Sequence, residues 1–295
     1  MLKVEYGKNG ELTCQSSING FPVYLDNFAV SFLARKSNPL RQRFLAALQN
    51  GADLLFSIAN GIEISGAQGD SALAIKAFLD DCGPHWYPVE LIPDVVIDRE
   101  RAGVEPSRCF FAEELLNAFF RNRTADYTPG SGNVIDLSAE FFKLGKFVDW
   151  LEPKRDYFLQ QCRAFDDMLI TSVGDLRAKH KKNPGWLDRT VPAPLFNPRM
   201  PAWFARNCLL RGLISDFGFQ VKKGDGMDFC HAVMASSYGT FASLDIQWKR
   251  RVKGFPRPNK SARIYHRNEL EKMMTDIESA LDQWKRGVSP VVLPT

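Results

Sequence analysis

Two apolar runs that lie more than two hundred residues apart each end on an aspartate. Residues 21–26 read FPVYLD and residues 240–245 read TFASLD, so that Asp26 and Asp245 follow short hydrophobic stretches typical of buried parallel strands. Parallel strands bring their carboxyl ends to one edge of a sheet, where ligands bind. Carboxylates gathered there repel each other unless they share a proton or hold a cation, so the two runs predict a metal site.

Other acidic residues also lie after a predicted strand or at the start of a predicted helix. Glu63 lies shortly after a second strand expected at 53–58, and Asp225 and Asp228 are three residues apart at the start of a helix expected at 225–238. Mg²⁺ and Mn²⁺ prefer oxygen ligands, which carboxylates supply. Two such ions can clamp the attacking and leaving oxygens of a phosphodiester and lower the pKa of a water.

Each acid also has a purely structural explanation. Asp26 and Asp245 are good N-cap residues for the helices that follow them, and Asp225 with Asp228 resembles a capping box. Glu63 fits a surface carboxylate near a helix start, stabilised by the helix dipole. All of these acids lie just after a predicted strand or near the start of a predicted helix. Their shared placement therefore favours one common site.

The elements that must position these acids alternate along the chain. Strands are expected at 21–26, 53–58, 240–245 and 262–265, and helices at 71–79, 203–214, 225–238, 246–253 and 268–286. This alternation predicts an α/β fold with a parallel sheet covered on both faces. The polar N-terminal segment favours a hairpin turning at Lys8-Asn9-Gly10.

The middle of the chain has a different pattern. It is rich in proline and predicts helices at 112–120, 139–151 and 154–168, with an irregular stretch at 184–201. We therefore expect one domain over 1–295, with a core formed by 20–83 and 205–286 and a helical insertion or subdomain at 84–204.

The acidic segments resemble the motifs of PIN-domain ribonucleases, and they occur in the same order. The resemblance rests on Val23-Tyr24-Leu25-Asp26-Asn27, Glu63, the segment 225–232 (DGMDFCHA) and Ala242-Ser243-Leu244-Asp245. It covers about 20–82 and 205–285, and Ser243 stands where many members have threonine. It implies a three-layer α/β/α fold and endonuclease cleavage of RNA. It also implies that Asp26, Glu63, Asp228 and Asp245 are catalytic and bind Mg²⁺ or Mn²⁺, with Asp225 as an accessory metal-binding acid.

A basic segment follows the last of these acids. The residues expected to bind RNA are Lys249, Arg250, Arg251, Lys253, Arg257 and Lys260. Trp248 and Phe255 are interleaved with them and could stack on bases. A solvated loop of ordinary charge is the alternative, and the position next to Asp245 favours nucleic acid.

Composition excludes several other classes. The net charge of +4 is too small to imply nucleic acid by itself, and the six cysteines show neither C-x-x-C nor zinc-ligand spacing. No apolar run approaches a membrane span and no signal peptide begins the chain, so we expect a cytoplasmic protein with no membrane partner. A phosphate loop and a G-x-S-x-G motif are absent, and Phe28 occupies the position of the second aspartate that a haloacid-dehalogenase phosphatase needs.

The sequence hypothesis is a metal-dependent endoribonuclease acting on single-stranded RNA. Two alternatives stay open: a non-catalytic PIN-like module that binds RNA or protein, and a DNA nuclease of the flap type. The resemblance is compatible with an inhibitor protein of the toxin–antitoxin kind, and the oligomeric state stays open. His231 is expected to bond a nearby acid or carbonyl rather than a ligand.

Overall fold

The computed structural model describes residues 2–6, 12–16, 18, 20–90, 92–123, 143–183, 185–191 and 193–287. At the N-terminus, β1 (Leu2–Tyr6) and β2 (Leu12–Ser16) form an antiparallel pair. The turn expected at residues 8–10 and the first residues of the helix expected at 139–151 lie outside the described residues.

The centre of the molecule is a five-stranded parallel sheet in the order β5-β4-β3-β6-β7. Its strands are β3 (Phe21–Tyr24), β4 (Ala52–Ser57), β5 (Trp86–Val89), β6 (Phe241–Ser243) and β7 (Arg263–Tyr265). The chain leaves β3 for β4 on one side and leaves β6 for β7 on the other. The strand order therefore reverses between β3 and β6, which is where ligands bind in open α/β sheets.

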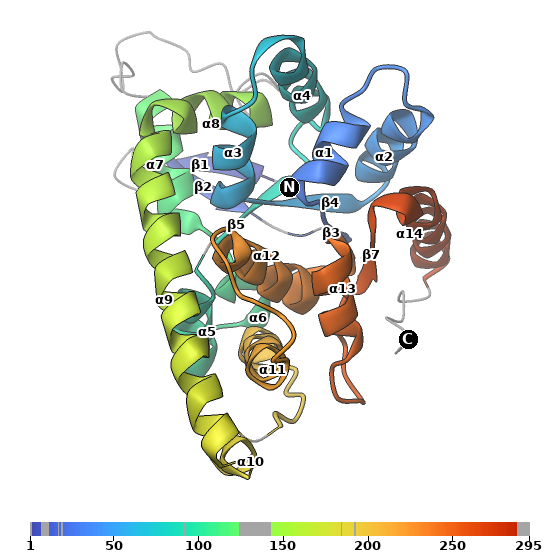
Figure 1. Ribbon diagram of the computed structural model, residues 1–295. Helices are drawn as coiled ribbons and strands as arrows, with labels where there is room; N and C mark the ends of the chain where they lie inside the picture. The colour runs from blue at the N-terminus through green and yellow to red at the C-terminus, as the bar shows by residue number, and fades with distance from the viewer. Residues whose placement is uncertain are drawn as a thin grey trace, which may run out of the picture.

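Helices cover both faces of this sheet, and the predicted α/β fold with three layers is confirmed (Figure 1). In one layer α2 packs on β4 and on α14, whereas in the other α12 packs on β6 and on α11 and α13. The helices are α1 (Asn27–Leu33), α2 (Pro39–Gln49), α3 (Ile58–Ser65), α4 (Gly69–Asp81), α5 (Pro93–Arg101), α6 (Pro106–Cys109), α7 (Glu113–Arg123), α8 (Leu144–Leu151), α9 (Arg155–Lys182), α10 (Trp186–Thr190), α11 (Pro201–Ser215), α12 (Asp225–Tyr238), α13 (Ile246–Lys253) and α14 (Leu270–Lys285).

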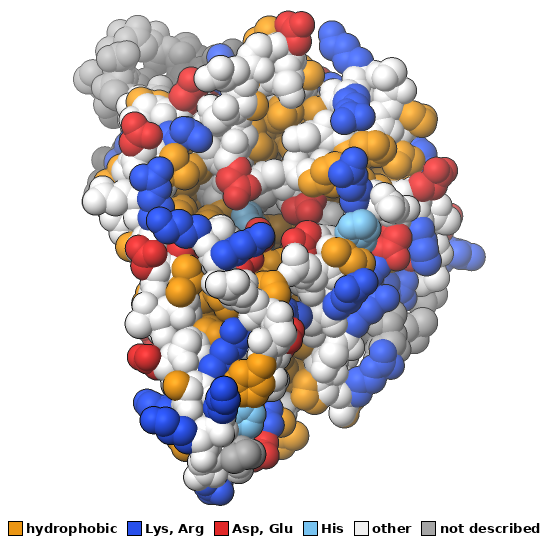
Figure 2. Space-filling model, viewed as in Figure 1, with side chains coloured by type: hydrophobic (Ala, Val, Ile, Leu, Met, Phe, Trp, Pro, Cys, Tyr) orange, Lys and Arg blue, Asp and Glu red, His pale blue; other side chains and the backbone are white. Residues whose placement is uncertain are grey.

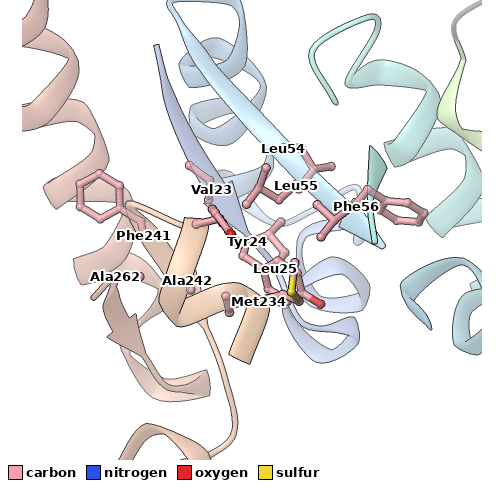
Figure 3. Close-up of a cluster of buried hydrophobic side chains, with 14 of the residues drawn as sticks. Val23, Tyr24, Leu25, Leu54, Leu55, Phe56, Met234, Phe241, Ala242 and Ala262 are labelled. Carbon is pink, nitrogen blue, oxygen red and sulfur yellow. The ribbon is translucent and has the colours of Figure 1, made fainter. Parts of the chain in front are cut away.

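The core lies between the three inner strands, β4, β3 and β6, and the helices that cover them. Figure 3 shows side chains of β3, β4 and β6 gathered around Tyr24 and Leu25, with Met234 reaching in from α12. Tyr24 is fully buried and pairs with Leu55 on one side and with Ala242 on the other. Apolar residues on both faces explain why these strands appear in the sequence as continuous hydrophobic runs.

Local sequence fixes several helix boundaries. Helices α12 and α13 begin and end where the apolar pattern predicts, and Pro39 at the first position of α2 follows the N-cap residue Asn38. The long helix α9 differs from the sequence prediction, since it continues past residue 168 to Lys182. The short helix α10 lies in a stretch predicted to be irregular.

The segment 84–204 contributes more than helices. Its first element, β5, pairs with β4 and forms an edge of the central sheet. The sequence prediction missed this strand because the run WYPV is short and contains a proline, which edge strands tolerate. The sheet therefore extends into the range that the sequence assigned to a helical insertion. Among the described helices, none is both long enough and apolar enough to cross a membrane.

Candidate functional site

The four acids expected to be catalytic line one small cavity. Asp26, Glu63, Asp228 and Asp245 surround a space of about 150 Å³ together with Asn27, Phe28, His231, Leu244 and Trp248. Asp26 follows β3 and Asp245 follows β6, so the cavity lies at the point where the strand order reverses. In Figure 2, acidic side chains gather near the centre of the face that carries α3, α12 and α13, with Lys and Arg side chains on both sides. We call this cavity the acidic pocket.

Asp26 is held in place from two directions. Its Oδ1 accepts hydrogen bonds from the backbone N–H of Ala29 and from Ser243 Oγ, each at 2.9 Å. The backbone N–H of Asp26 in turn donates to Ser243 Oγ at 2.9 Å. Asp26 is therefore the N-cap of α1, which is the structural role that the sequence suggested for it. It also lines the acidic pocket. Among the described residues only Oδ1 is used in these bonds, which leaves Oδ2 for a ligand.

Asp245 and Asp228 are connected through Trp248. Asp245 caps α13, since its Oδ1 accepts from the backbone N–H groups of Gln247 and Trp248 at 2.8 and 3.0 Å. The buried indole of Trp248 also hydrogen-bonds the Asp228 side chain. The first turn of α13 thus fixes one acid by its backbone and a second by a side chain.

Glu63 reaches the acidic pocket from α3. This helix starts with a capping box in which Ser57 Oγ accepts from the Asn60 N–H at 3.2 Å and Asn60 Oδ1 accepts from the Ser57 N–H at 3.0 Å. The Asn60 amide also donates to the Leu25 carbonyl at 3.2 Å, which ties α3 to the end of β3. Glu63 lies on the second turn of α3, beyond the reach of an N-terminal cap.

Burial and mutual repulsion raise the pKa of these carboxyls. Burial, followed by repulsion from Asp228 and Asp26, raises the pKa of Glu63 to about 7, although part of its side chain contacts solvent. Burial and repulsion from Asp245 raise the pKa of Asp228 to about 6, against the opposing effect of the Trp248 hydrogen bond. The pKa of Asp26 is also raised, chiefly by burial. The carboxyls of the pocket therefore repel one another when they are ionised, and a bound cation would relieve that repulsion.

Asp225 does not line the acidic pocket. It is buried, and its Oδ2 accepts from the backbone N–H of Lys222 at 2.7 Å. The expectation that Asp225 is the N-cap of α12 is wrong, because Gly224 occupies that position with φ of +95°. Asp225 still raises the pKa of Asp228 by repulsion.

The cap of α12 comes instead from Asp166 on α9, a residue that the sequence did not single out. Asp166 accepts from the backbone N–H groups of Gly224 and Gly226 at 2.9 and 2.8 Å. A side chain at Gly226 would place its Cβ 2.5 Å from Asp166 Oδ1, so glycine is required for this close approach. No local pattern reveals a cap that lies about sixty residues away.

The long helix α9 also supports the acidic pocket by packing. Ala59 of α3, Cys162 of α9 and Met227 of α12 form a small buried cluster of their own. This cluster connects the helix that carries Glu63 with the helix that carries Asp228. Part of the segment 84–204 therefore braces the two helices that bring acids to the pocket.

His231 lies in the wall of the acidic pocket, and its partner differs from the one expected. Its Nδ1 hydrogen-bonds the Tyr24 hydroxyl on β3, so the expected bond to a local acid or carbonyl is wrong. The side chain is 7 % exposed, and Nε2 is buried with no hydrogen-bond partner in the described structure. Burial lowers the pKa of His231 to about 4, which keeps the imidazole neutral at neutral pH.

The donors of the acidic pocket fit a hard divalent cation in type. They are carboxylate oxygens from four separate elements, together with an imidazole nitrogen that lacks a partner. Within the described ranges, no three acidic, histidine or cysteine side chains already converge closely enough to hold a metal ion. Coordination would therefore require these side chains to turn toward one another.

The basic residues near α13 fall into separate groups. Lys249, Lys253 and Arg257 line a second cavity of about 540 Å³ beside β7, which also includes Arg263 and Lys272. We call this cavity the basic cleft. Arg250 and Arg251 line a different cavity against α11, and Lys260 lines a third. The basic segment is thus not a single continuous patch.

Several of these charges are already used within the protein. Lys249 is buried and paired with Glu269, and Arg251 pairs with Asp216 at 3.0 Å and lies over the Phe219 ring. Lys253 and Arg257 are exposed, and neither forms an ion pair within the described residues. These two side chains are therefore the best placed of the basic cleft to contact an anion.

The expectation that Trp248 and Phe255 stack on bases is wrong. Trp248 is 2 % exposed and packs edge-on against Phe229, and Phe255 packs against Phe204 in the core. Their spacing along the chain reflects the inner face of α13 and of the turn that follows it.

Comparison with known proteins adds no identification. No protein-family model matches the chain, and neither a curated protein nor a solved structure does.

Proposed function

We propose that this protein is a metal-dependent endoribonuclease of the PIN type. The observation that carries the proposal is the acidic pocket, in which Asp26, Glu63, Asp228 and Asp245 from four distant segments meet where the strand order reverses. Structural caps alone would explain Asp26 and Asp245, but they leave Glu63 and Asp228 without a reason to face the same cavity.

Mg²⁺ or Mn²⁺ would be held by the same four carboxylates and, when bound, would supply a water of lowered pKa and stabilise charge on the phosphate. Asp26 and Asp245 are fixed by their helix caps and present their second carboxylate oxygens. Glu63 and Asp228, whose pKa values are about 7 and 6, carry protons more readily than ordinary carboxyls. Binding of the cation would release those protons.

The substrate would be a single strand of RNA. The basic cleft lies across α13 from the acidic pocket, since Trp248 faces the pocket and Lys249 faces the cleft. A strand cleaved at the pocket would have its phosphates attracted by Lys253 and Arg257. The five cysteines whose side chains are described are unpaired, which agrees with action in the cytoplasm.

The test is cleavage of single-stranded RNA by Asp245→Asn in the presence of Mn²⁺. Asparagine is also a good N-cap residue, so α13 should stay folded while the pocket loses a charge. We expect cleavage to be abolished and circular dichroism to be unchanged. Asp282→Asn is the matched control, because it removes an exposed acid on α14 that does not line the acidic pocket.

Undiminished cleavage by Asp245→Asn would contradict the proposal. Cleavage of DNA oligonucleotides in preference to RNA would favour a flap-type nuclease instead. Absence of heat in calorimetry with Mn²⁺ and with Mg²⁺ would favour a non-catalytic binding module.

A further inference from the structure

The unpartnered nitrogen of His231 is the feature of the acidic pocket that its carboxylates do not explain. Nε2 is buried, lacks a hydrogen-bond partner within the described structure, and belongs to a residue that lines the pocket. A buried polar atom without a partner is unfavourable, so it calls for a reason. Whether Nε2 can bind a cation depends on which ring nitrogen carries the proton.

The Tyr24 hydroxyl hydrogen-bonds His231 Nδ1, and this bond is compatible with either tautomer of the neutral imidazole. In the tautomer that carries its proton on Nδ1, the imidazole donates to the Tyr24 oxygen and Nε2 presents a bare lone pair. A cation bound at Nε2 selects this tautomer.

We propose that His231 Nε2 is a metal ligand in the acidic pocket, so that the site prefers a first-row transition ion such as Mn²⁺ over Mg²⁺. This inference rests on the proposed function. Mn²⁺ also favours oxygen ligands but accepts an imidazole among them, whereas Mg²⁺ selects oxygen ligands and keeps several of its waters. A ligating histidine normally donates its other N–H to an outer partner, and Tyr24 occupies that place here.

The experiment uses the full chain and the metals alone. Electron spin echo modulation of bound Mn²⁺ reports nitrogen in the first coordination shell without any need for catalysis. We expect one imidazole nitrogen in the wild type and none in His231→Phe. Calorimetry should show Mn²⁺ affinity falling about 10-fold or more in His231→Phe, with the Mg²⁺ affinity changed far less.

Two further variants sharpen the test. Tyr24→Phe removes the acceptor for the Nδ1 proton and should weaken Mn²⁺ binding about 10-fold through loss of the tautomer. His266→Gln is the matched control: His266 lies close enough to Asp26 to affect its pKa but does not line the acidic pocket. The nitrogen signal should persist in this variant.

The outcomes separate the two proposals. Mn²⁺ bound by the wild type without nitrogen modulation, or a signal that His231→Phe keeps, would overturn the role of His231 and leave the carboxylate site standing. Failure of the wild type to bind either Mn²⁺ or Mg²⁺ would overturn both. Because the wild-type spectrum is decisive by itself, the test holds even where a variant fails to fold.

Discussion

Asp26 and Ser243 hydrogen-bond each other twice across the junction of β3 and β6, although they lie 217 positions apart in the chain. The Ser243 hydroxyl accepts from the Asp26 backbone and donates to the Asp26 carboxylate. This pair joins the two central strands at the place where the strand order reverses, and it orients one of the four acids of the pocket.

Replacement of Ser243 by alanine should therefore affect stability and activity together. We expect a loss of about 1 kcal/mol in the free energy of unfolding, because the Asp26 N–H loses its acceptor. Metal-dependent cleavage should fall about 10-fold, as is common when a group that orients a ligand is removed. Ser243→Thr retains the hydroxyl and should keep most of the activity. Denaturant unfolding and cleavage assays would check both effects, and equal activity of the two variants would contradict the positioning role.

Replacement of Asp228 by asparagine should stabilise the metal-free protein at high pH. The pKa of Asp228 is raised from 3.8 to about 6, so between these values the folded state holds more protons than the unfolded state. The protonated Asp228 carboxyl therefore contributes stability to the folded state. This contribution is present below the unfolded pKa and is lost as pH rises through the folded pKa. At about pH 8 the variant should be about 1–3 kcal/mol more stable than the wild type, and near pH 4 the difference should vanish.

Asp276→Asn provides a control of opposite sign. Hydrogen bonds from Lys272 and Tyr265 outweigh burial and lower the pKa of Asp276, so its stabilisation is present above the unfolded pKa and is lost in acid. Chemical denaturation in chelator at several pH values would measure both variants. Destabilisation by Asp228→Asn at high pH would show that the pocket is not electrostatically strained.

Replacement of Asp166 by alanine should loosen the start of α12. The backbone N–H groups of Gly224 and Gly226 lose their acceptor, which should lower the free energy of unfolding by about 1–2 kcal/mol. Binding of Mn²⁺ should weaken as well, because Asp228 lies on the same first turn. The neighbouring exposed residue gives the control, Asp167→Ala, which should leave both unchanged. Thermal unfolding with and without Mn²⁺ would separate the two variants.

Replacement of Lys253 and Arg257 by alanine should weaken RNA binding in a salt-dependent way. Each lost phosphate contact should reduce the slope of log K against log salt by about 0.7 for a single strand. Arg250→Ala is the control, since Arg250 is exposed but lines a different cavity. Fluorescence anisotropy across a salt series would measure the slopes. An equal effect of Arg250→Ala would contradict the assignment of the basic cleft to RNA.

The sequence by itself determined the layered α/β architecture and the positions of four acids. Continuous apolar runs at β3, β4 and β6 and the clear boundaries of α12 and α13 are local properties, so a pattern of neighbours along the chain can reveal them. The expectation that Asp26 and Asp245 follow parallel strands was sufficient to place them at one edge of the sheet.

Only the tertiary structure decided which groups support those acids. The contacts of Ser243 with Asp26, of Tyr24 with His231 and of Asp166 with Gly226 each join residues at least sixty positions apart. Folding also buried Trp248 and divided the basic segment among separate cavities, because a helix directs successive side chains to different faces. Hydrogen-bond partners across such distances depend on how elements pack, which local periodicity does not encode.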